Sequence, residues 1–161
     1  MRLDDIDQQI VAWLSRDGRS SYRTIGTSVG LSAPAVKRRV DRLVAAGVIE
    51  RFAAVIDPRA VGWSTEAFVE LFCEGRTPPA LIRTALARFP EVVGAYTITG
   101  DPDALVHVRA SDTSHLEATL EKVRSEPFVV RTRSVIVLSR LLERQVTPKE
   151  RQAAPEEDRD G

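Results

Sequence analysis

Apolar residues in the first third of the chain recur at helical spacing, and the clearest stripe lies within residues 33–46. Its members follow one another at intervals of four, three and one residues: Val36, Val40, Leu43 and Val44. Residues at these intervals share one face of a helix, so the pattern predicts an amphipathic helix that packs on its neighbours. Ser32 stands where an N-cap is expected, and Pro34 is tolerated in the first helical turn.

A shorter apolar helix precedes this one, and a glycine turn joins the two. Ile25 and Val29 lie one helical turn apart, and Gly26 between them is small enough for a neighbouring helix to approach. Gly30 can adopt the positive φ that ends a helix and turns the chain. Residues 22–49 therefore have the organisation of two packed helices joined by a tight turn.

A third stripe lies at the start of the chain and predicts a helix over residues 4–16, with Asp4 or Asp5 as its cap. The members of this stripe are Ile6, Ile10, Trp13 and Leu14. Together the three helices can close a small core, and we expect Trp13 to be its largest side chain.

The outer face of the 33–46 helix is predicted to be basic. On a helical wheel at about 100° per residue, the residues that point away from the stripe are Pro34, Arg38, Asp41 and Arg42, with Lys37 and Arg39 flanking it. A helix-turn-helix whose second helix offers cations outward can enter a DNA major groove. A run of Lys and Arg on a helix is often no more than a solvated face, but here the turn glycine, the cap, the stripe and the cations fall in register. We therefore expect double-stranded DNA as a partner.

The second half of the chain changes to strand-like runs, which lie at residues 66–73, 92–99, 104–110 and 130–138. A helix with Thr77 as its cap is expected between the first two runs, and another, capped by Asp112 or Ser114, between the last two. The order βαββαβ predicts an α+β fold, in which a ferredoxin-like antiparallel sheet has two helices on one face.

Apolar residues occur on both faces of the predicted strands. In the first strand one face carries Ala67, Val69 and Leu71, and the other carries Phe68 and Phe72. A sheet that helices cover on one side should be polar on its other side. We therefore expect a second copy of the chain to cover the open face.

The net charge of the chain limits how strongly it can bind nucleic acid. The 161 residues hold 23 Lys and Arg and 23 Asp and Glu, a formal net charge of zero. The distribution is uneven, because residues 1–57 carry nine basic and seven acidic residues. Affinity for phosphate should be modest for one chain, and an assembly of several chains would raise it.

Several other classes of protein are disfavoured by composition. Cys73 is the only cysteine, which excludes an intrachain disulfide and a cysteine metal cluster. No apolar run approaches the ~20 residues needed to span a bilayer, and no signal peptide is apparent. Nothing resembles a nucleophile triad, a phosphate loop or a set of metal ligands. We expect a soluble, cytoplasmic protein that is not an enzyme, needs no cofactor or metal and does not bind membranes.

These patterns divide the chain into four parts. Residues 1–47 are the predicted helix-turn-helix domain, and residues 48–62 are a predicted wing-like strand and hinge. Residues 63–144 are the predicted ferredoxin-like domain, through which the chain is expected to oligomerise. Residues 145–161, which hold two prolines and many charges, are a predicted disordered tail.

Taken in order, four stretches of the chain resemble the Lrp/AsnC family, the feast/famine regulators. They are LDDIDQQIVAWLSRDGRSSY, VGLSAPAVKRRVDRLVAAGVIERFAAVIDP, the TGDPD turn and VVRTRSVIVLSRL. The resemblance covers residues 2–142 and implies a winged helix-turn-helix followed by a ferredoxin-like domain that dimerises through its sheet. It also implies further assembly, for example into octamers, and transcriptional regulation by a small-molecule effector such as an amino acid, bound between C-terminal domains.

Two groups of site residues follow from the resemblance and the helical wheel together. The group expected to face DNA is Ser32, Pro34, Ala35, Lys37, Arg38, Arg39 and Arg42. The group expected around the effector is Thr99, Gly100, Asp101 and Asp103, with the hydroxyls of Thr132 and Ser134. A carboxylate such as Asp103 can pair with an α-ammonium group, while backbone N–H groups and hydroxyls can bind the α-carboxylate. Pro102 stands where many members of the family have an aromatic residue, and it offers no backbone N–H, so whether the pocket binds a ligand stays open.

Two other functions also stay open. An architectural protein could use the same helices to wrap or bend DNA with little sequence preference and no effector. An enzyme is the third alternative, because some haem-pathway decarboxylases resemble this architecture. Only two histidines are present; we expect His107 to be a packed or interfacial residue and His115 to face solvent.

Overall fold

The computed structural model describes residues 2–143, which belong to two compact units. One unit comprises the N-terminal part of the chain through Ala54, together with Glu143, and the other comprises residues 55–142. The division falls within the predicted linker of residues 48–62. The predicted tail at residues 145–161 lies outside the described residues.

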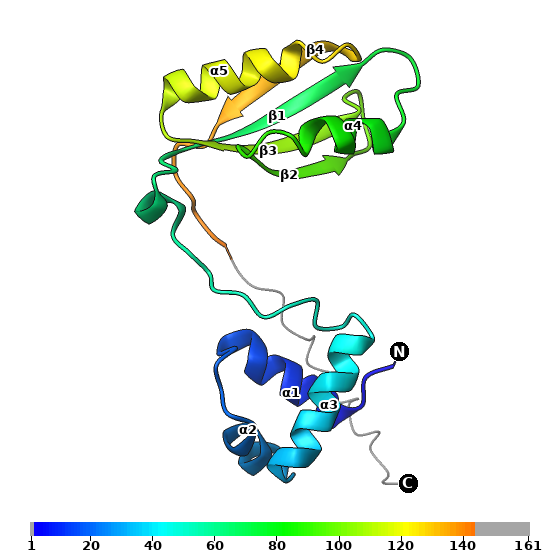
Figure 1. Cartoon of the computed structure of the whole chain (residues 1–161), viewed down its shortest axis with the longest axis vertical. Coiled ribbons are helices and arrows are strands. Elements are labelled where there is room, and N and C mark those ends of the chain that lie inside the picture. The colour runs from blue at the N-terminus through cyan, green and yellow to red at the C-terminus, as the bar shows by residue number, and fades with distance from the viewer. Residues whose placement is uncertain (1, 144–161) are drawn as a thin grey trace, which may run out of the picture. The chain divides into compact units, whose positions relative to one another are not determined.

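The N-terminal unit contains three helices, α1 (Asp5–Arg16), α2 (Tyr22–Val29) and α3 (Ala33–Ala45) (Figure 1). They pack around a core of buried side chains, which are Ile10, Ile25, Val36, Val40 and Leu43. Each belongs to one of the three apolar stripes, because helical spacing places the stripe on the inner face. The predicted helix-turn-helix is confirmed.

Two residues predicted for this core lie outside it. Trp13 is 37% exposed and Val44 is 42% exposed. Both stand at the margin of their stripes, beside Ile10 and Leu43 respectively, and a core of three short helices does not extend that far. The prediction of Trp13 as the largest core side chain is therefore wrong.

The turn between α2 and α3 depends on two glycines. Gly30 ends α2 with a φ of 69°, in the left-handed region that glycine adopts without a steric penalty. Gly26 accepts the backbone N–H of Leu31 at 2.9 Å. A Cβ added to Gly26 would lie 2.3 Å from the carbonyl oxygen of Leu31. The close approach predicted at Gly26 therefore comes from the backbone of the turn itself.

The predicted wing-like strand does not form in this chain. Residues 50–57 have no regular secondary structure, and a short 3-10 helix, η1 (Pro58–Val61), follows them. A strand needs a neighbour to complete its hydrogen-bond ladder, and no strand of the described residues pairs with this segment. Its apolar side chains are accordingly exposed, Val55 by 86%.

The C-terminal unit is a four-stranded antiparallel sheet with two helices. In chain order its elements are β1 (Thr65–Cys73), α4 (Pro79–Leu86), β2 (Val92–Thr97), β3 (Ala104–Ala110), α5 (Thr113–Arg124) and β4 (Val129–Ile136). The strands lie in the order β2-β3-β1-β4, and both helices lie on the same side of the sheet (Figure 1). The predicted α+β fold and βαββαβ order are confirmed. No helix within residues 2–143 combines the length and the apolar character that a bilayer span requires.

The two helices of this unit begin at positions that differ in part from the prediction. Pro78, not Thr77, occupies the N-cap of α4, and the Thr77 hydroxyl instead donates to the carbonyl of Glu74 at 2.9 Å. Asp112 is the cap of α5, because its carboxylate accepts the backbone N–H of His115 at 2.8 Å. Ser114, the alternative cap, lies inside the first turn of α5.

The sheet has one face packed under the helices and one face that no helix of this unit covers. The packed face contributes the buried residues Ala67, Val69, Leu71, Val106 and Val108 to the core. Leu116 and Val123 of α5 and Ile82 of α4 pack against them. The alternate residues of β1 are only partly buried, as strand periodicity requires.

Replacement of Gly26 by Ala tests the turn. The added methyl group must displace the Leu31 carbonyl, so we expect Gly26→Ala to lower the free energy of unfolding of the N-terminal unit by about 1–3 kcal/mol, although Ala is the better helix former. Urea denaturation followed by circular dichroism measures this change. Ser28→Ala, an exposed change in the same helix, should alter stability by less than about 0.5 kcal/mol. A Gly26→Ala variant as stable as the wild type would contradict this account of the turn.

Candidate DNA-binding and effector sites

The start of α3 is accessible. Ser32 occupies the N-cap position with an extended backbone, but its hydroxyl makes no capping hydrogen bond. Pro34 lies in the first turn, where its missing N–H has no consequence. Ser32 and Pro34 are exposed, and Ala35 is half-buried. These three predicted DNA contacts therefore lie together at the N-terminal end of the helix.

Further along α3, Arg39 and Arg42 extend toward α1. Arg39 Nη1 lies 2.6 Å from Asp4 Oδ2 and 2.8 Å from Asp7 Oδ1, and Arg42 Nη2 lies 2.8 Å from Asp7 Oδ2. We call these four residues the α1–α3 ion-pair cluster. The side chain of Asp7 is only 2% exposed, whereas that of Arg42 is 53% exposed. Arg42 lies away from the apolar stripe, as predicted, but its guanidinium group reaches a buried carboxylate of α1.

The same two aspartates also begin α1. Asp4 is the N-cap, and its Oδ1 accepts the backbone N–H of Asp7 at 2.7 Å. Asp7 accepts the backbone N–H of Asp4 in return, at 3.4 Å, which completes a capping box. Negative charge is favoured at a helix N-terminus. Asp4 and Asp7 thus satisfy α1 and hold α3 at the same time.

The other two cations of α3 lie apart from the cluster. Lys37 pairs with Asp41 at 2.6 Å, one helical turn along, and both side chains are more than half exposed. Such surface pairs contribute little to stability. Arg38 is exposed and has no ion pair among the described residues. Arg38 is therefore the α3 cation that is accessible and unpaired within residues 2–143.

Hydrogen bonding fixes the charges of these groups. The bond from Arg39, aided by the backbone N–H of Asp7, holds the pKa of Asp4 below its ordinary value of 3.8. The bonds to Asp4 and Asp7 raise the pKa of Arg39, and the bond to Asp41 raises the pKa of Lys37. These shifts favour the charged forms of Asp4, Arg39 and Lys37 at neutral pH.

The pairing of the acidic and basic residues was not predicted from the sequence. A signal was present, because Asp4 and Asp7 are three residues apart, and so are Arg39 and Arg42. Residues three apart share a helix face, so two acids on one helix can meet two arginines on another. Single-helix periodicity cannot show which helices face each other, and the pairing appears only in the folded unit.

The predicted effector turn connects β2 to β3. Thr99, Gly100, Asp101 and Asp103 are exposed there. Gly100 has a φ of 117°, which favours glycine. Asp103 Oδ2 accepts the backbone N–H of Cys73 at 2.7 Å, and the N–H of Asp103 donates to the carbonyl of Leu71 at 2.8 Å. One oxygen of the Asp103 carboxylate therefore extends the β1–β3 ladder.

The two predicted effector hydroxyls lie on β4, on the helix side of the sheet. Thr132 is opposite Leu71 and Ser134 is opposite Val69, both of which are buried under the helices. The Thr132 hydroxyl accepts a hydrogen bond from Arg124 Nε at 2.9 Å. Ser134 Oγ is buried and has no hydrogen-bond partner within the described part of the chain. A buried hydroxyl without a partner is uncommon and requires an explanation.

The turn and the hydroxyls occupy the same end of the sheet but are not in contact within one chain. Ala104, next to the turn, and Thr132 flank Leu71 from opposite sides. Two inter-strand spacings, roughly 10 Å, therefore separate their backbones. One chain alone does not gather the predicted effector residues into a single pocket.

The open face of the sheet carries paired charges among its aromatic rings. Glu66 binds Arg140 at 2.9 Å and also binds His107, whose ring stacks on Phe68 with centroids 4.6 Å apart. Burial raises the pKa of Glu66, but the bonds from Arg140 and His107 outweigh this effect and hold its pKa below the ordinary value. The open face is therefore less apolar than strand alternation predicted, although its charges are neutralised locally.

Further along the open face the same pattern recurs. Arg133 makes a two-point contact with Glu70, and the guanidinium of Arg131 lies 3.7 Å from the centroid of the Phe72 ring. Both contacts leave the arginine partly exposed, and the pKa of Arg133 is raised by its bond to Glu70.

A second buried carboxylate lies near the start of α5. Glu91 is 5% exposed, and its Oε1 lies 3.0 Å from His115 Nε2 and 3.8 Å from Lys122 Nζ. His115 is one-third exposed and bonded on both ring nitrogens, so the expectation that it simply faces solvent is wrong. These contacts join α5 to the start of β2.

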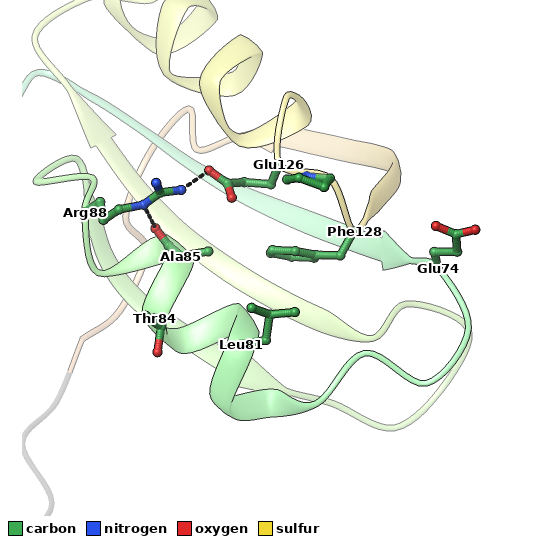
Figure 2. A pocket seen from close by; sticks show the side chains of 8 residues that line it. Glu74, Leu81, Thr84, Ala85, Arg88, Glu126 and Phe128 are labelled. Carbon is green, nitrogen blue, oxygen red and sulfur yellow. Dashed lines mark hydrogen bonds and ion pairs between the residues drawn. The ribbon is translucent and has the colours of Figure 1, made fainter.

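A cavity of about 590 Å³ opens on the helix side of the C-terminal unit. It lies between α4 and the segment before β4, with Leu81 and Phe128 as its apolar lining and an ion pair between Arg88 and Glu126 at its rim (Figure 2). None of the predicted effector residues lines it. No group of three or more His, Cys, Asp or Glu side chains within residues 2–143 could hold a metal ion.

Comparison with known families matches both units of the chain. Residues 3–44 match the AsnC-type helix-turn-helix domain, and residues 66–147 match the Lrp/AsnC ligand binding domain. The HTH-type transcriptional regulator Rv2324 of Mycobacterium tuberculosis is 52% identical over 143 residues, which cover 89% of this chain and 97% of that protein. The proline dehydrogenase transcriptional activator of Rhizobium radiobacter is 35% identical over 144 residues, which cover 88% and 92% of the two chains.

A solved structure agrees with these matches. The leucine response regulatory protein LrpA of Mycobacterium tuberculosis superposes with a TM-score of 0.80 at 36% sequence identity. The superposition covers 91% of this chain and all of that one. The fold and the order of the two units are therefore shared along nearly the whole chain.

The lowered pKa of Asp4 predicts how the ion-pair cluster responds to acid. Because the folded-state pKa lies below the unfolded one, the Asp4–Arg39 pair stabilises the unit fully above about pH 5 and stops doing so as the pH falls through the folded pKa, below 3.8. Asp4→Asn lacks this contribution at every pH. The difference in free energy of unfolding between the wild type and Asp4→Asn should thus shrink as the pH falls from 5 to 2.

Urea denaturation at a series of pH values measures this difference. Glu50→Gln serves as the control, since Glu50 is exposed and pairs with no cation among the described residues. A difference for Asp4→Asn that stays constant down to pH 2 would contradict the assignment.

Proposed function

Since the chain belongs to the Lrp/AsnC family of DNA-binding transcriptional regulators, we propose that it recognises specific duplex sequences through α3 and responds to an amino acid or a related small metabolite. The observation that carries the first part is the accessible outer side of α3. Ser32, Pro34 and Arg38 are exposed there, while the apolar side closes the core. Such a regulator acts where the DNA is, so we expect it in the cytoplasm.

The N-terminal end of α3 suits a major groove. The Ser32 hydroxyl is not used for capping and is free to bind a phosphate oxygen. Lys37 can exchange its exposed partner Asp41 for a phosphate at little cost. Arg38 can form two parallel hydrogen bonds with a guanine edge. The predicted contacts of Ala35, Arg39 and Arg42 are less accessible, because Ala35 and Arg39 are half-buried and Arg42 is bound to Asp7.

Self-association is the second component of the proposal. The open face of the sheet exposes Tyr96 by 56% and Val135 by 60%, among charges that are already paired. A second copy can cover such a face without leaving unpaired charges buried. A homodimer would present two α3 helices to two half-sites, and higher assemblies such as octamers would add further sites.

The effector is the third component. The family match of residues 66–147 is to a ligand-binding domain, and the superposed relative is named for a leucine response. Asp103 has one carboxylate oxygen beyond the bond to Cys73, and Ser134 has a buried hydroxyl without a partner in the described chain. An α-ammonium and an α-carboxylate group are suitable partners for these two. The roughly 10 Å between the turn and β4 favours a pocket completed by a second copy.

Selection of bound duplexes from a random library tests sequence-specific recognition. With the full chain we expect enrichment of one motif made of two related half-sites, whose centres are separated by whole turns of about 10 base pairs. Retention of duplexes without an enriched motif would instead support an architectural role. Failure to retain any duplex at low salt, together with binding of a tetrapyrrole, would favour the decarboxylase-like alternative.

Titration calorimetry with a panel of the twenty amino acids tests the effector. Ser134→Ala removes a hydroxyl that has no partner in the described chain, so we expect unchanged thermal stability and about tenfold weaker binding of the effector. Asp103→Asn keeps an acceptor for Cys73 but removes the charge, and should weaken binding by roughly 10- to 100-fold. Absence of binding by any member of the panel, or unchanged binding by both variants, would exclude this pocket.

A further inference from the structure

The four cations of α3 differ in how their charges are used. Arg39 and Arg42 bind the carboxylates of α1, Lys37 binds Asp41 on its own helix, and Arg38 has no ion-pair partner within residues 2–143. Three carboxylates therefore oppose four cations, which leaves the unit with one uncompensated charge on this helix.

Burial separates the two kinds of pair. Asp7 is 2% exposed and is bound by both arginines of the cluster, whereas Asp41 is 56% exposed and, within residues 2–143, is bound only by Lys37. A duplex that captured Arg39 or Arg42 would leave the buried Asp7 carboxylate short of a partner, which is strongly unfavourable. A duplex that captured Lys37 would leave Asp41 in water.

We propose that Arg38 is the cation of α3 that determines sequence specificity, and that Asp7 is a positioning residue which keeps Arg39 and Arg42 out of the DNA contacts. This inference rests on the proposed DNA-binding function. Of the predicted basic face, only Arg38 is then assigned to contacts with bases. Lys37 and Ser32 are assigned to contacts with the phosphate backbone of the DNA. Asp7 also has a structural role, because the two arginines that it binds fix the orientation of α3 on α1.

The proposal is tested by replacing single cations of α3 and measuring the affinity of each variant for the duplex selected from the random library. Arg38→Ala should lose affinity by roughly 5- to 150-fold, the equivalent of ~1–3 kcal/mol, with an unchanged melting temperature. Arg42→Ala should lower the melting temperature but change affinity less than about threefold when measured well below it. Arg42→Lys keeps a cation beside Asp7 and should recover part of the lost thermal stability.

Release of the two arginines is the converse test. In Asp7→Asn the freed cations become available to phosphates, so the slope of log K against log salt should steepen by up to about two. The ratio of specific to non-specific affinity should fall, because phosphate contacts carry no sequence information. A residue that only stabilised the fold would change the melting temperature without changing either quantity. If Asp7→Asn does not fold, Asp4→Asn, which frees Arg39 from its exposed partner, should steepen the slope by less than one.

These experiments distinguish failure of this inference from failure of the proposed DNA-binding function. Wild-type protein that binds no duplex would overturn the DNA-binding function itself. Wild-type protein that binds, with a folded Arg42→Ala variant as impaired as Arg38→Ala, would overturn only the assignment of Arg38 and Asp7. An unchanged salt slope and an unchanged affinity ratio in a folded Asp7→Asn or Asp4→Asn variant would do the same.

Discussion

The buried carboxylate of Asp7 is the constraint on which the N-terminal unit depends. The core of this unit consists of a few aliphatic side chains, and hydrophobic contact between them is not directional. Ion pairs with hydrogen bonds are directional, and Asp7 makes them with both Arg39 and Arg42. Because Asp7 also belongs to the capping box of α1, its position is set by its own helix as well as by its bonds to α3. The orientation of α3 is therefore tied to the first turn of the chain.

The C-terminal unit also pairs its carboxylates with arginines, in this case on the open face of its sheet. Its open face holds carboxylates and cations, but each of the central acids, Glu66 and Glu70, is bound by an arginine within the same unit. Pairing lets a charged face be covered by another protein surface without an uncompensated charge, which is the largest cost of burying such groups. Aromatic rings lie directly beside these pairs, as in the contacts of Phe68 with His107 and of Phe72 with Arg131. The face thus combines apolar area with neutralised charge.

Local signals in the sequence predicted much of the fold, and the errors have a common physical origin. Positive φ at Gly30, the Asp4 cap at the start of α1 and the βαββαβ order all depend on short segments, and each is present. The prediction of a wing-like strand at residues 48–62 was wrong because a strand requires a pairing partner, which no local pattern supplies. The predicted burial of Trp13 and Val44 was wrong because periodicity shows which residues face inward, but it does not show how far a small core extends.

The candidate sites were predicted less completely for the same reason. Helical periodicity placed Arg38 on the outside of α3 correctly, but it could not show that Arg42, which it also placed outside, reaches a carboxylate in another helix. Likewise the resemblance grouped the turn at residues 99–103 with Thr132 and Ser134, and only the strand register reveals that β1 lies between them. Long side chains and strand order are decided by tertiary contacts.

Charge neutrality and DNA binding are compatible in this chain because the cations are used unequally. A strongly basic surface binds any duplex through phosphate neutralisation, and its affinity says little about sequence. Here most cations of α3 are already bound to carboxylates of the same unit, so non-specific attraction is kept low. Under the proposed function each chain would contribute few contacts, and tight binding would come from several copies acting on one duplex. The paired open face of the sheet, where a second copy can be accommodated, is consistent with that requirement. The proposed self-association would thus offset the weak single-chain affinity that this arrangement of charges predicts.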